Sequence, residues 1–215
     1  MVRLFVFDLD GTLVDSARDL ADAANLLLQS CGARPLQTDA IVRMIGEGAA
    51  LLVARAFEAA GLPAPPDALE KFLAFYDTRL LEHTRPYVGI EEVLGRLEQR
   101  AFLAVLTNKP LAAARRILVG LDLARYFPHE AVLGGDGPFP RKPDPAGLRY
   151  LAAQAGVDPN QTLLVGDSVI DWRTGQRASV RVCLARYGFG FQTVPVGELD
   201  GREHLIDAPA ELLAL

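Results

Sequence analysis

A short hydrophobic run that ends in two aspartates constrains this chain more than any other part of its sequence. Residues 4–7 are apolar or aromatic, and Asp8, Asp10 and Gly11 follow closely. The run predicts a buried strand, along which alternate side chains point to the same side, so Asp8 and Asp10 converge. Gly11 allows a sharp turn that brings backbone N–H groups close to a ligand. Because two neighbouring carboxylates repel one another unless a cation or a shared proton relieves them, the stretch indicates a metal site.

Three interpretations of this stretch compete. Asp8 and Asp10 can be turn formers that close a strand, since aspartate side chains readily bond their own backbone. A helix-loop-helix calcium loop is excluded, because Leu13 stands where that loop requires glycine and because a strand precedes the aspartates. The third interpretation is a phosphoryl-transfer site, in which one carboxylate is the nucleophile and the other is the proton donor.

The composition restricts the environment and the partners of the chain. Half of its 215 residues are hydrophobic and its net charge is −5, which gives no support for a nucleic-acid or membrane-surface partner. Cys31 and Cys183 are far apart and are expected to be free thiols in a reducing cytosol. No signal-peptide pattern or membrane-spanning run is found, so we expect a cytoplasmic protein. The only lysines are Lys71, Lys109 and Lys142, so a lysine at a functional site would be conspicuous.

The segment 15–85 is predicted to be entirely helical. Amphipathic stripes recur along it, and no strand pattern separates them, which is typical of a small helical bundle. The predicted helices run from Asp15 or Ser16 to about residue 31, and over residues 38–44, 51–60 and 67–80.

Beyond Pro86 helices and strands alternate, which indicates a parallel sheet. The predicted strands are residues 102–106, 131–133, 162–165, 180–184 and 205–206, and the predicted helices are residues 90–100, 110–118, 145–155 and 171–178 and a final short helix. The first strand has no helix of its own and is expected to join this sheet. We therefore predict an α/β fold in which residues 1–14 and 86–215 form a Rossmann-like parallel sheet core and residues 15–85 form a small all-helical cap domain.

Polar residues follow several of the predicted strands at the points where those strands end. Thr107 and Asn108 follow strand 102–106, and Asp167 and Ser168 follow strand 162–165. Ligands of open parallel sheets bind beyond the carboxyl ends of the strands, where the first strand also delivers its two aspartates. Asp171, one turn beyond Asp167, and the proline-flanked Lys142 add two further charged groups. Chance is a poor explanation of this combination.

These motifs, in this order, resemble those of the haloacid dehalogenase superfamily. They are residues 8–12 (DLDGT), 106–108 (LTN), 142–143 (KP) and 166–171 (GDSVID). A lone Thr-Asn or Lys-Pro would carry no meaning, but the set is highly specific. The helical insert directly after the first motif is similar to the cap of the branch that contains phosphoglycolate phosphatases and β-phosphoglucomutases. Smaller similarities to the first of these groups are residues 45–48, 107–110, 134–136, 187–190 and 204–212.

The chain departs from this resemblance at Gly175 and Ser179, where such proteins more often have alanine and glycine. Ser179 falls at the predicted end of a helix, so we expect it to adopt a left-handed backbone conformation. The departure concerns local packing rather than the chemistry of the site.

The resemblance implies a catalytic role for four residues. Asp8 would attack phosphorus and form an aspartyl-phosphate, and Asp10 would protonate the leaving alkoxide and then deprotonate the hydrolytic water. Thr107 and Lys142 would hold the phosphoryl oxygens, where electrostatic stabilisation is usually the largest contribution to catalysis. Considered singly, Thr107 can instead cap a helix and Lys142 can be a solvated surface lysine.

The resemblance also implies Mg²⁺ as the cofactor. Its ligands would be Asp8, the backbone carbonyl of Asp10 and Asp167, with Asp171 ordering the water shell of the ion, although Asp171 alone can equally be a helix cap. Oxygen ligands with retained waters suit this ion. The candidate substrate-binding residues are Gly11, Thr107, Asn108 and Lys142 in the core and Gly46, Glu47 and Gly48 in the cap.

The cap residues are candidates because Gly46, Glu47 and Gly48 interrupt its helical pattern. A glycine-opened helix start exposes N–H groups that can meet an anion, and a two-carbon acid offers the cap little but its carboxylate. Glu47 would repel that carboxylate, so we expect its side chain to point away or to pair with an arginine, for which Arg43 and Arg55 are nearby. The alternative is a tight turn between two helices.

The function predicted from the sequence is that of a magnesium-dependent phosphatase for 2-phosphoglycolate or a similarly small phosphomonoester. Two alternatives stay open, a sugar phosphomutase of the β-phosphoglucomutase type and a broad-specificity small-molecule phosphatase. A dehalogenase is disfavoured, because carbon–halogen displacement needs no metal. Residues 188–190 (GFG) are expected to be a loop rather than a nucleotide cradle. The expected partner is a small-molecule substrate, with no nucleic acid and no membrane, and the expected state is a monomer or a homodimer.

Overall fold

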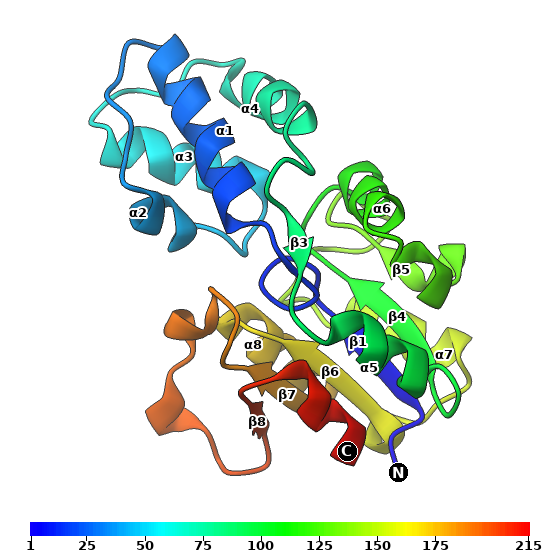
Figure 1. The fold of residues 1–215 in the computed structure, drawn as a ribbon. Coiled ribbons are helices and arrows are strands. Elements are labelled where there is room, and N and C mark those ends of the chain that lie inside the picture. Colours follow the sequence, from blue (N-terminus) through cyan, green and yellow to red (C-terminus); the bar gives the residue numbers. More distant parts are fainter.

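Strand β1 (Leu4–Phe7) lies inside a six-stranded sheet in the computed structural model, which describes residues 1–215 (Figure 1). The strand order is β5-β4-β1-β6-β7-β8, and all neighbouring strands of this sheet are parallel. The remaining strands of the sheet are β4 (Phe102–Leu106), β5 (Val132–Leu133), β6 (Thr162–Gly166), β7 (Arg181–Ala185) and β8 (His204–Ile206). The predicted α/β class is confirmed.

Both faces of β1 are buried, as its hydrophobic run predicts. Phe5 and Phe7 belong to the largest hydrophobic core, whereas Leu4 and Val6 belong to a second core. This division follows from the alternation of side chains along a strand. Helices α5 and α6 contribute side chains to the first core, and α7 contributes to the second. The helices of this part are α5 (Ile90–Leu97), α6 (Leu111–Gly120), α7 (Ala146–Gln154) and α8 (Val169–Ala178).

Four further helices form a separate layer at one end of the sheet (Figure 1). They are α1 (Ala17–Ser30), α2 (Thr38–Val42), α3 (Ala49–Ala59) and α4 (Ala68–Asp77). Helix α1 contacts each of the other three, and the large side chains of Leu27, Phe57 and Phe72 are fully buried. The helical cap predicted from the sequence is therefore present.

A two-stranded antiparallel ribbon connects these helices to the sheet. It pairs β2 (Val14–Asp15) with β3 (Arg85–Pro86), at the positions where the sequence analysis places the two domain boundaries, although no strand is predicted there. Next to the ribbon, the carboxylate of Asp19 accepts hydrogen bonds from the backbone N–H groups of His83 and Thr84 and from the Thr84 hydroxyl. These bonds tie the start of α1 to the segment that returns to the sheet.

Several helix boundaries differ from those predicted; α5, for example, ends at Leu97 rather than at Arg100. Helix α8 begins at Val169 rather than at Asp171, because Ser168 is its N-cap and Asp171 completes a capping box. The predicted final short helix is present as a 3₁₀ helix, Pro209–Ala214. Ser179 has a φ of +58°, so its expected left-handed conformation is confirmed.

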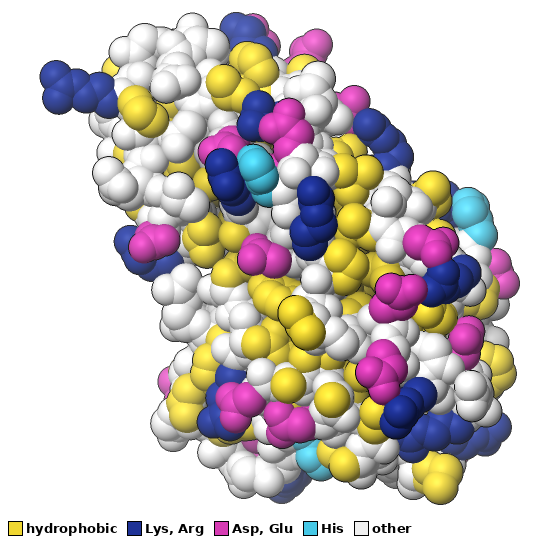
Figure 2. All heavy atoms as spheres, in the orientation of Figure 1, with side chains coloured by type: hydrophobic (Ala, Val, Ile, Leu, Met, Phe, Trp, Pro, Cys, Tyr) yellow, Lys and Arg dark blue, Asp and Glu magenta, His cyan; other side chains and the backbone are white.

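Charges of both signs are interspersed on the face shown in Figure 2, and hydrophobic side chains gather near the junction between α1–α4 and the sheet-bearing part. No helix combines the length and the hydrophobicity that crossing a membrane requires. Cys31 and Cys183 are both free, as expected.

Candidate active site

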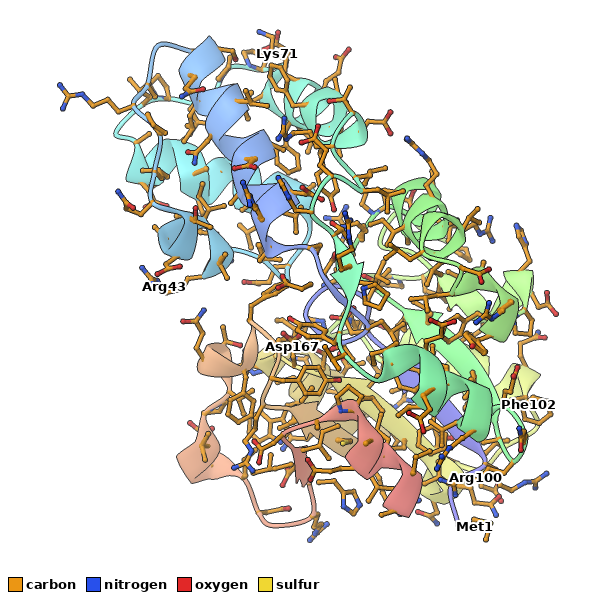
Figure 3. All side chains as sticks on the ribbon, in the orientation of Figure 1. Met1, Arg43, Lys71, Arg100, Phe102 and Asp167 are labelled. Carbon is orange, nitrogen blue, oxygen red and sulfur yellow. The ribbon has the colours of Figure 1, made fainter.

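The segments that follow β1, β4 and β6 meet at one edge of the sheet. These strands are adjacent and parallel, so their carboxyl ends lie at the same edge. Asp167 lies between the sheet and helices α1–α4, whereas Met1, Arg100 and Phe102 lie at the opposite end (Figure 3). The structure thus brings the polar strand ends together beneath the cap.

Asp8, Asp167 and Asp171 form a buried carboxylate cluster at this edge. One carboxylate oxygen from each lies within 4.8 Å of the other two. Burial raises the pKa of Asp8 to about 7 against the opposing effect of the Lys142 ammonium. Burial and the neighbouring carboxylates of Asp171 and Asp8 raise the pKa of Asp167 well above its ordinary value. The cluster therefore favours a bound proton or a bound cation over three free carboxylates.

Lys142 is the cation that this cluster already contains. Its ammonium lies 2.9 Å from Asp8 Oδ1 and 2.6 Å from Asp171 Oδ1. Burial alone would lower the pKa of Lys142, but the two carboxylates raise it above its ordinary value. The side chain is only 2% exposed, so Lys142 is not a surface lysine. Asp171 does cap a helix, but it also binds this buried ammonium.

The donor set of the cluster fits a magnesium ion. The cluster has three carboxylates and one ammonium, which pairs with Asp8 and Asp171, so negative charge remains for a cation to neutralise. Mg²⁺ prefers carboxylate oxygens and keeps several of its waters. The Asp10 carboxylate is not part of this cluster.

The Asp10 carboxylate binds Lys109 instead. Lys109 Nζ lies 2.9 Å from both Asp10 oxygens, and the Ser16 hydroxyl also donates to Asp10 Oδ1. From the cap, Tyr76 places its ring face 4.6 Å from the same ammonium. Lys109 is not among the site residues predicted from the sequence. The available signals were the scarcity of lysine and its position directly after Asn108.

Thr107 and Asn108 are both buried below the cap. Thr107 Oγ1 accepts a hydrogen bond from the backbone N–H of Lys109 at 3.2 Å. It does not cap α6, because this helix begins at Leu111 with Pro110 as its N-cap and has no side-chain capping bond, so the helix-cap interpretation is wrong. The Asn108 side-chain amide donates to the carbonyls of Lys142 and of Gly46, each at 3.0 Å. Asn108 therefore links two core motifs to the cap loop.

Three glycines, Gly11, Gly188 and Gly190, leave the space that Asp167 occupies. Gly11 has a φ of +86°, and a β-carbon there would lie 2.0 Å from Asp167 Oδ2. The backbone N–H of Gly190 donates to the same oxygen at 2.7 Å. Residues 188–190 do form a loop, as expected, but sequence analysis did not predict that the loop holds Asp167.

A cavity of about 60 Å³ lies between the strand ends and the cap. Asp8, Asp10, Thr107 and Asn108 line it from the core, and Gly46, Gly48, Ala49 and Tyr76 are among its cap residues. Gly48 has a φ of +94° and is the N-cap of α3, so this helix begins at the cavity. Glu47 does not line the cavity, although it is one of the candidate substrate-binding residues. Its carboxylate pairs with Arg55, as expected.

Comparison with known proteins agrees with this geometry. Residues 5–185 match the family described as haloacid dehalogenase-like hydrolase. The chain is 45% identical to the phosphoglycolate phosphatase of Rhodospirillum rubrum, over 90% of this chain and 83% of that protein. The chain belongs to the haloacid dehalogenase-like hydrolases. The resemblance on which the sequence analysis rests is therefore confirmed.

Other members of the haloacid dehalogenase-like hydrolases are similar over almost the whole chain. The phosphoglycolate phosphatase of Caulobacter vibrioides is 34% identical, over 97% of this chain and 90% of that protein. A crystal structure of a predicted phosphoglycolate phosphatase from Haemophilus somnus superposes with a TM-score of 0.90 at 31% identity, covering 99% of this chain and 97% of that chain. The family match ends at Ala185, so the loop that carries Gly190 lies just beyond it.

Proposed function

We propose that this chain is a magnesium-dependent phosphatase that hydrolyses 2-phosphoglycolate to glycolate and phosphate through an aspartyl-phosphate. One observation carries the proposal, namely the buried cluster of Asp8, Asp167 and Asp171 with Lys142 bound to Asp8. The names of the similar proteins from Rhodospirillum rubrum and Caulobacter vibrioides support the choice of substrate. Action in the cytoplasm, as a monomer or homodimer, is part of the same proposal.

Asp8 is the nucleophile in this mechanism. Its Oδ1 accepts from the backbone N–H of Leu9 at 2.7 Å and binds Lys142, whereas its Oδ2 makes no hydrogen bond and is free to attack phosphorus. As the bond from Asp8 to phosphorus forms, the bond from phosphorus to the alcohol oxygen breaks, and Asp10 gives that oxygen a proton. Asp10 then takes a proton from the water that attacks the aspartyl-phosphate, and Asp8 is released with inorganic phosphate.

The remaining core residues would bind the metal ion and the phosphoryl group. Asp8, Asp167 and the backbone carbonyl of Asp10 would bind Mg²⁺, with Asp171 ordering its waters, and the ion would offset the negative charge of the phosphoryl group. Lys142 and Thr107 would hold phosphoryl oxygens. Lys142 is held in place for this role by Asp8 and Asp171. Gly11 would allow close approach of the backbone.

The size of the cavity favours a compact substrate. Its volume of about 60 Å³ is well below the roughly 300–1,000 Å³ of sites for drug-sized ligands. A two-carbon acid fits this description better than the hexose phosphate of a sugar phosphomutase. The loop that contains Gly46 and Gly48 precedes α3 and lines the cavity. The backbone N–H groups of this cap loop would bind the substrate.

A phosphate-release panel tests the proposed function. The enzyme is assayed with 2-phosphoglycolate, ethyl phosphate, β-glucose 1-phosphate and p-nitrophenyl phosphate, in Mg²⁺ and in excess chelator. The proposal predicts that 2-phosphoglycolate has the highest kcat/KM and that chelator abolishes activity. Conversion of the hexose phosphate to another sugar phosphate without phosphate release would establish a mutase. Similar kcat/KM values for all esters would establish a broad-specificity phosphatase.

A further inference from the structure

We propose that Lys109 binds the carboxylate of the substrate, and that Asp10 takes the place of that carboxylate while the cavity is empty. The assignment rests on the proposed function, because it supposes a phosphate ester that carries a second negative group. It makes Lys109 the residue that selects phosphate esters with a carboxylate over esters whose alcohol part is uncharged.

The charged side chains that line the cavity favour Lys109 as the group that binds the carboxylate. Lys109 is the only lysine or arginine among the residues that line it, whereas Asp8, Asp10 and Asp167 all do so. A substrate carboxylate would be repelled by these three side chains at short range. Lys109 is the one lining side chain that attracts it.

The contacts of Lys109 also suit a carboxylate ligand. Its side chain is 4% exposed, yet its ammonium forms a two-oxygen contact with a carboxylate, at 2.9 Å to each oxygen of Asp10. The ring of Tyr76 covers the ammonium from α4, on the cap side of the cavity. The ammonium is therefore positioned between core and cap, and it already binds the kind of group that a substrate acid would present.

None of the other lysines and arginines lines the cavity. Lys142 is bound by Asp8 and Asp171 and belongs to the phosphoryl end of the site. Arg55 pairs with Glu47, and the Arg141 Nε donates to the carbonyl of Gly135. Lys71 is exposed, pairs with Asp67, and lies at the end of the cap farthest from Asp167 (Figure 3).

An exchange of partners follows from this arrangement. When the substrate carboxylate takes the Lys109 ammonium, both Asp10 oxygens lose their contact with it. Asp10 then keeps the Ser16 hydroxyl as a partner on Oδ1, which leaves Oδ2 for the ester oxygen of the substrate. An ester whose alcohol part is uncharged has no carboxylate to displace Asp10 from Lys109. Such an ester therefore binds without this rearrangement.

The test compares 2-phosphoglycolate with ethyl phosphate, in which a methyl group replaces the carboxylate on the same ester carbon. The readout is the ratio of the two kcat/KM values in the unaltered enzyme and in Lys109→Met, Lys109→Arg and Lys71→Met. We expect Lys109→Met to reduce this ratio at least about tenfold, mainly by weakening the binding of the acidic ester, because a close charge pair is lost. Lys109→Arg should restore most of the ratio, and Lys71→Met should leave it unchanged.

Two outcomes separate this assignment from the proposed function. An active Lys109→Met enzyme with an unchanged ratio overturns the assignment of Lys109 and leaves the proposed function intact. An unaltered enzyme that releases no phosphate from 2-phosphoglycolate overturns both. Thermal unfolding of each variant identifies a misfolded one, and Lys109→Gln, which keeps a polar side chain, replaces Lys109→Met if the latter does not fold.

Discussion

The ammonium of Lys142 lies 2.9 Å from Asp8 Oδ1, and neither side chain is more than 10% exposed. A buried charge pair of this kind loses much of its stabilisation when one partner is removed, because the other charge is left without compensation. We therefore expect a substitution of either residue to affect both the stability of the protein and its catalytic activity.

Lys142→Ala should slow the turnover of 2-phosphoglycolate by more than about tenfold, or ~1.4 kcal/mol of transition-state stabilisation. The alanine removes the ammonium that binds Asp8 and that we propose to hold a phosphoryl oxygen. Phosphate release at saturating substrate measures the effect, with Lys71→Ala as the control at an exposed lysine. A loss smaller than tenfold would show that Lys142 has no important contact with the reacting group.

Asp10→Asn should slow esters with poor leaving groups far more than p-nitrophenyl phosphate. General acid catalysis contributes roughly 10²- to 10⁴-fold, and the p-nitrophenolate leaving group needs little protonation. The two substrates are compared in the same enzyme preparation, after thermal unfolding has shown that the variant folds without the charge partner of Lys109. Equal losses on both substrates would mean that Asp10 serves structure rather than proton transfer.

Gly48→Val should weaken the apparent binding of 2-phosphoglycolate, raising its Michaelis constant at least about fivefold, or about 1 kcal/mol. Gly48 has a φ of +94°, and a β-carbon there would lie 2.9 Å from Arg141 Nη1, so valine crowds the loop at the cavity. Gly61→Val is the matched control, because Gly61 has a φ of +69° and open space around it. If Gly48→Val changes the Michaelis constants of 2-phosphoglycolate and p-nitrophenyl phosphate alike, the proposal that this loop binds the substrate is wrong.

Magnesium should stabilise the protein more at pH 8 than at pH 5. The pKa of Asp8 in the metal-free fold is about 7, above its ordinary value of 3.8, so the folded state binds more protons than the unfolded state between these values. The metal-free protein therefore loses stability as the pH rises through this window, and the raised pKa of Asp167 acts in the same direction. Thermal unfolding with Mg²⁺ and with chelator at both pH values measures the gain. An equal gain at both would contradict the placement of the ion beside these carboxylates.

The strands and the acidic groups could be predicted because their signals are local. A hydrophobic run such as residues 4–7 indicates a buried strand, and parallel topology alone brings its carboxyl end close to that of residues 162–166. Asp8 and Asp167 could thus be placed in one site before any contact was known. The left-handed conformation of Ser179 was predictable for a similar reason, because it depends on the helix end beside this residue.

The contacts of Lys109 could not be predicted in the same way. Its partners Asp10 and Tyr76 lie far from it in sequence, and the contact with Tyr76 requires the cap to pack over the strand ends. The bond from Gly190 to Asp167 likewise depends on how a loop without regular structure folds back over the sheet. Such contacts arise from tertiary packing, and no periodicity in the sequence encodes them.

Phosphate release from 2-phosphoglycolate by the unaltered enzyme and by Asp8→Asn, side by side in Mg²⁺, tests the central claim most directly. Asparagine keeps the shape of Asp8 but cannot form the acyl phosphate, so the account predicts rapid release by the first enzyme and none above background by the second. Excess chelator should abolish release by the unaltered enzyme. Substantial release by a pure and folded Asp8→Asn preparation, or full activity in chelator, would contradict the account.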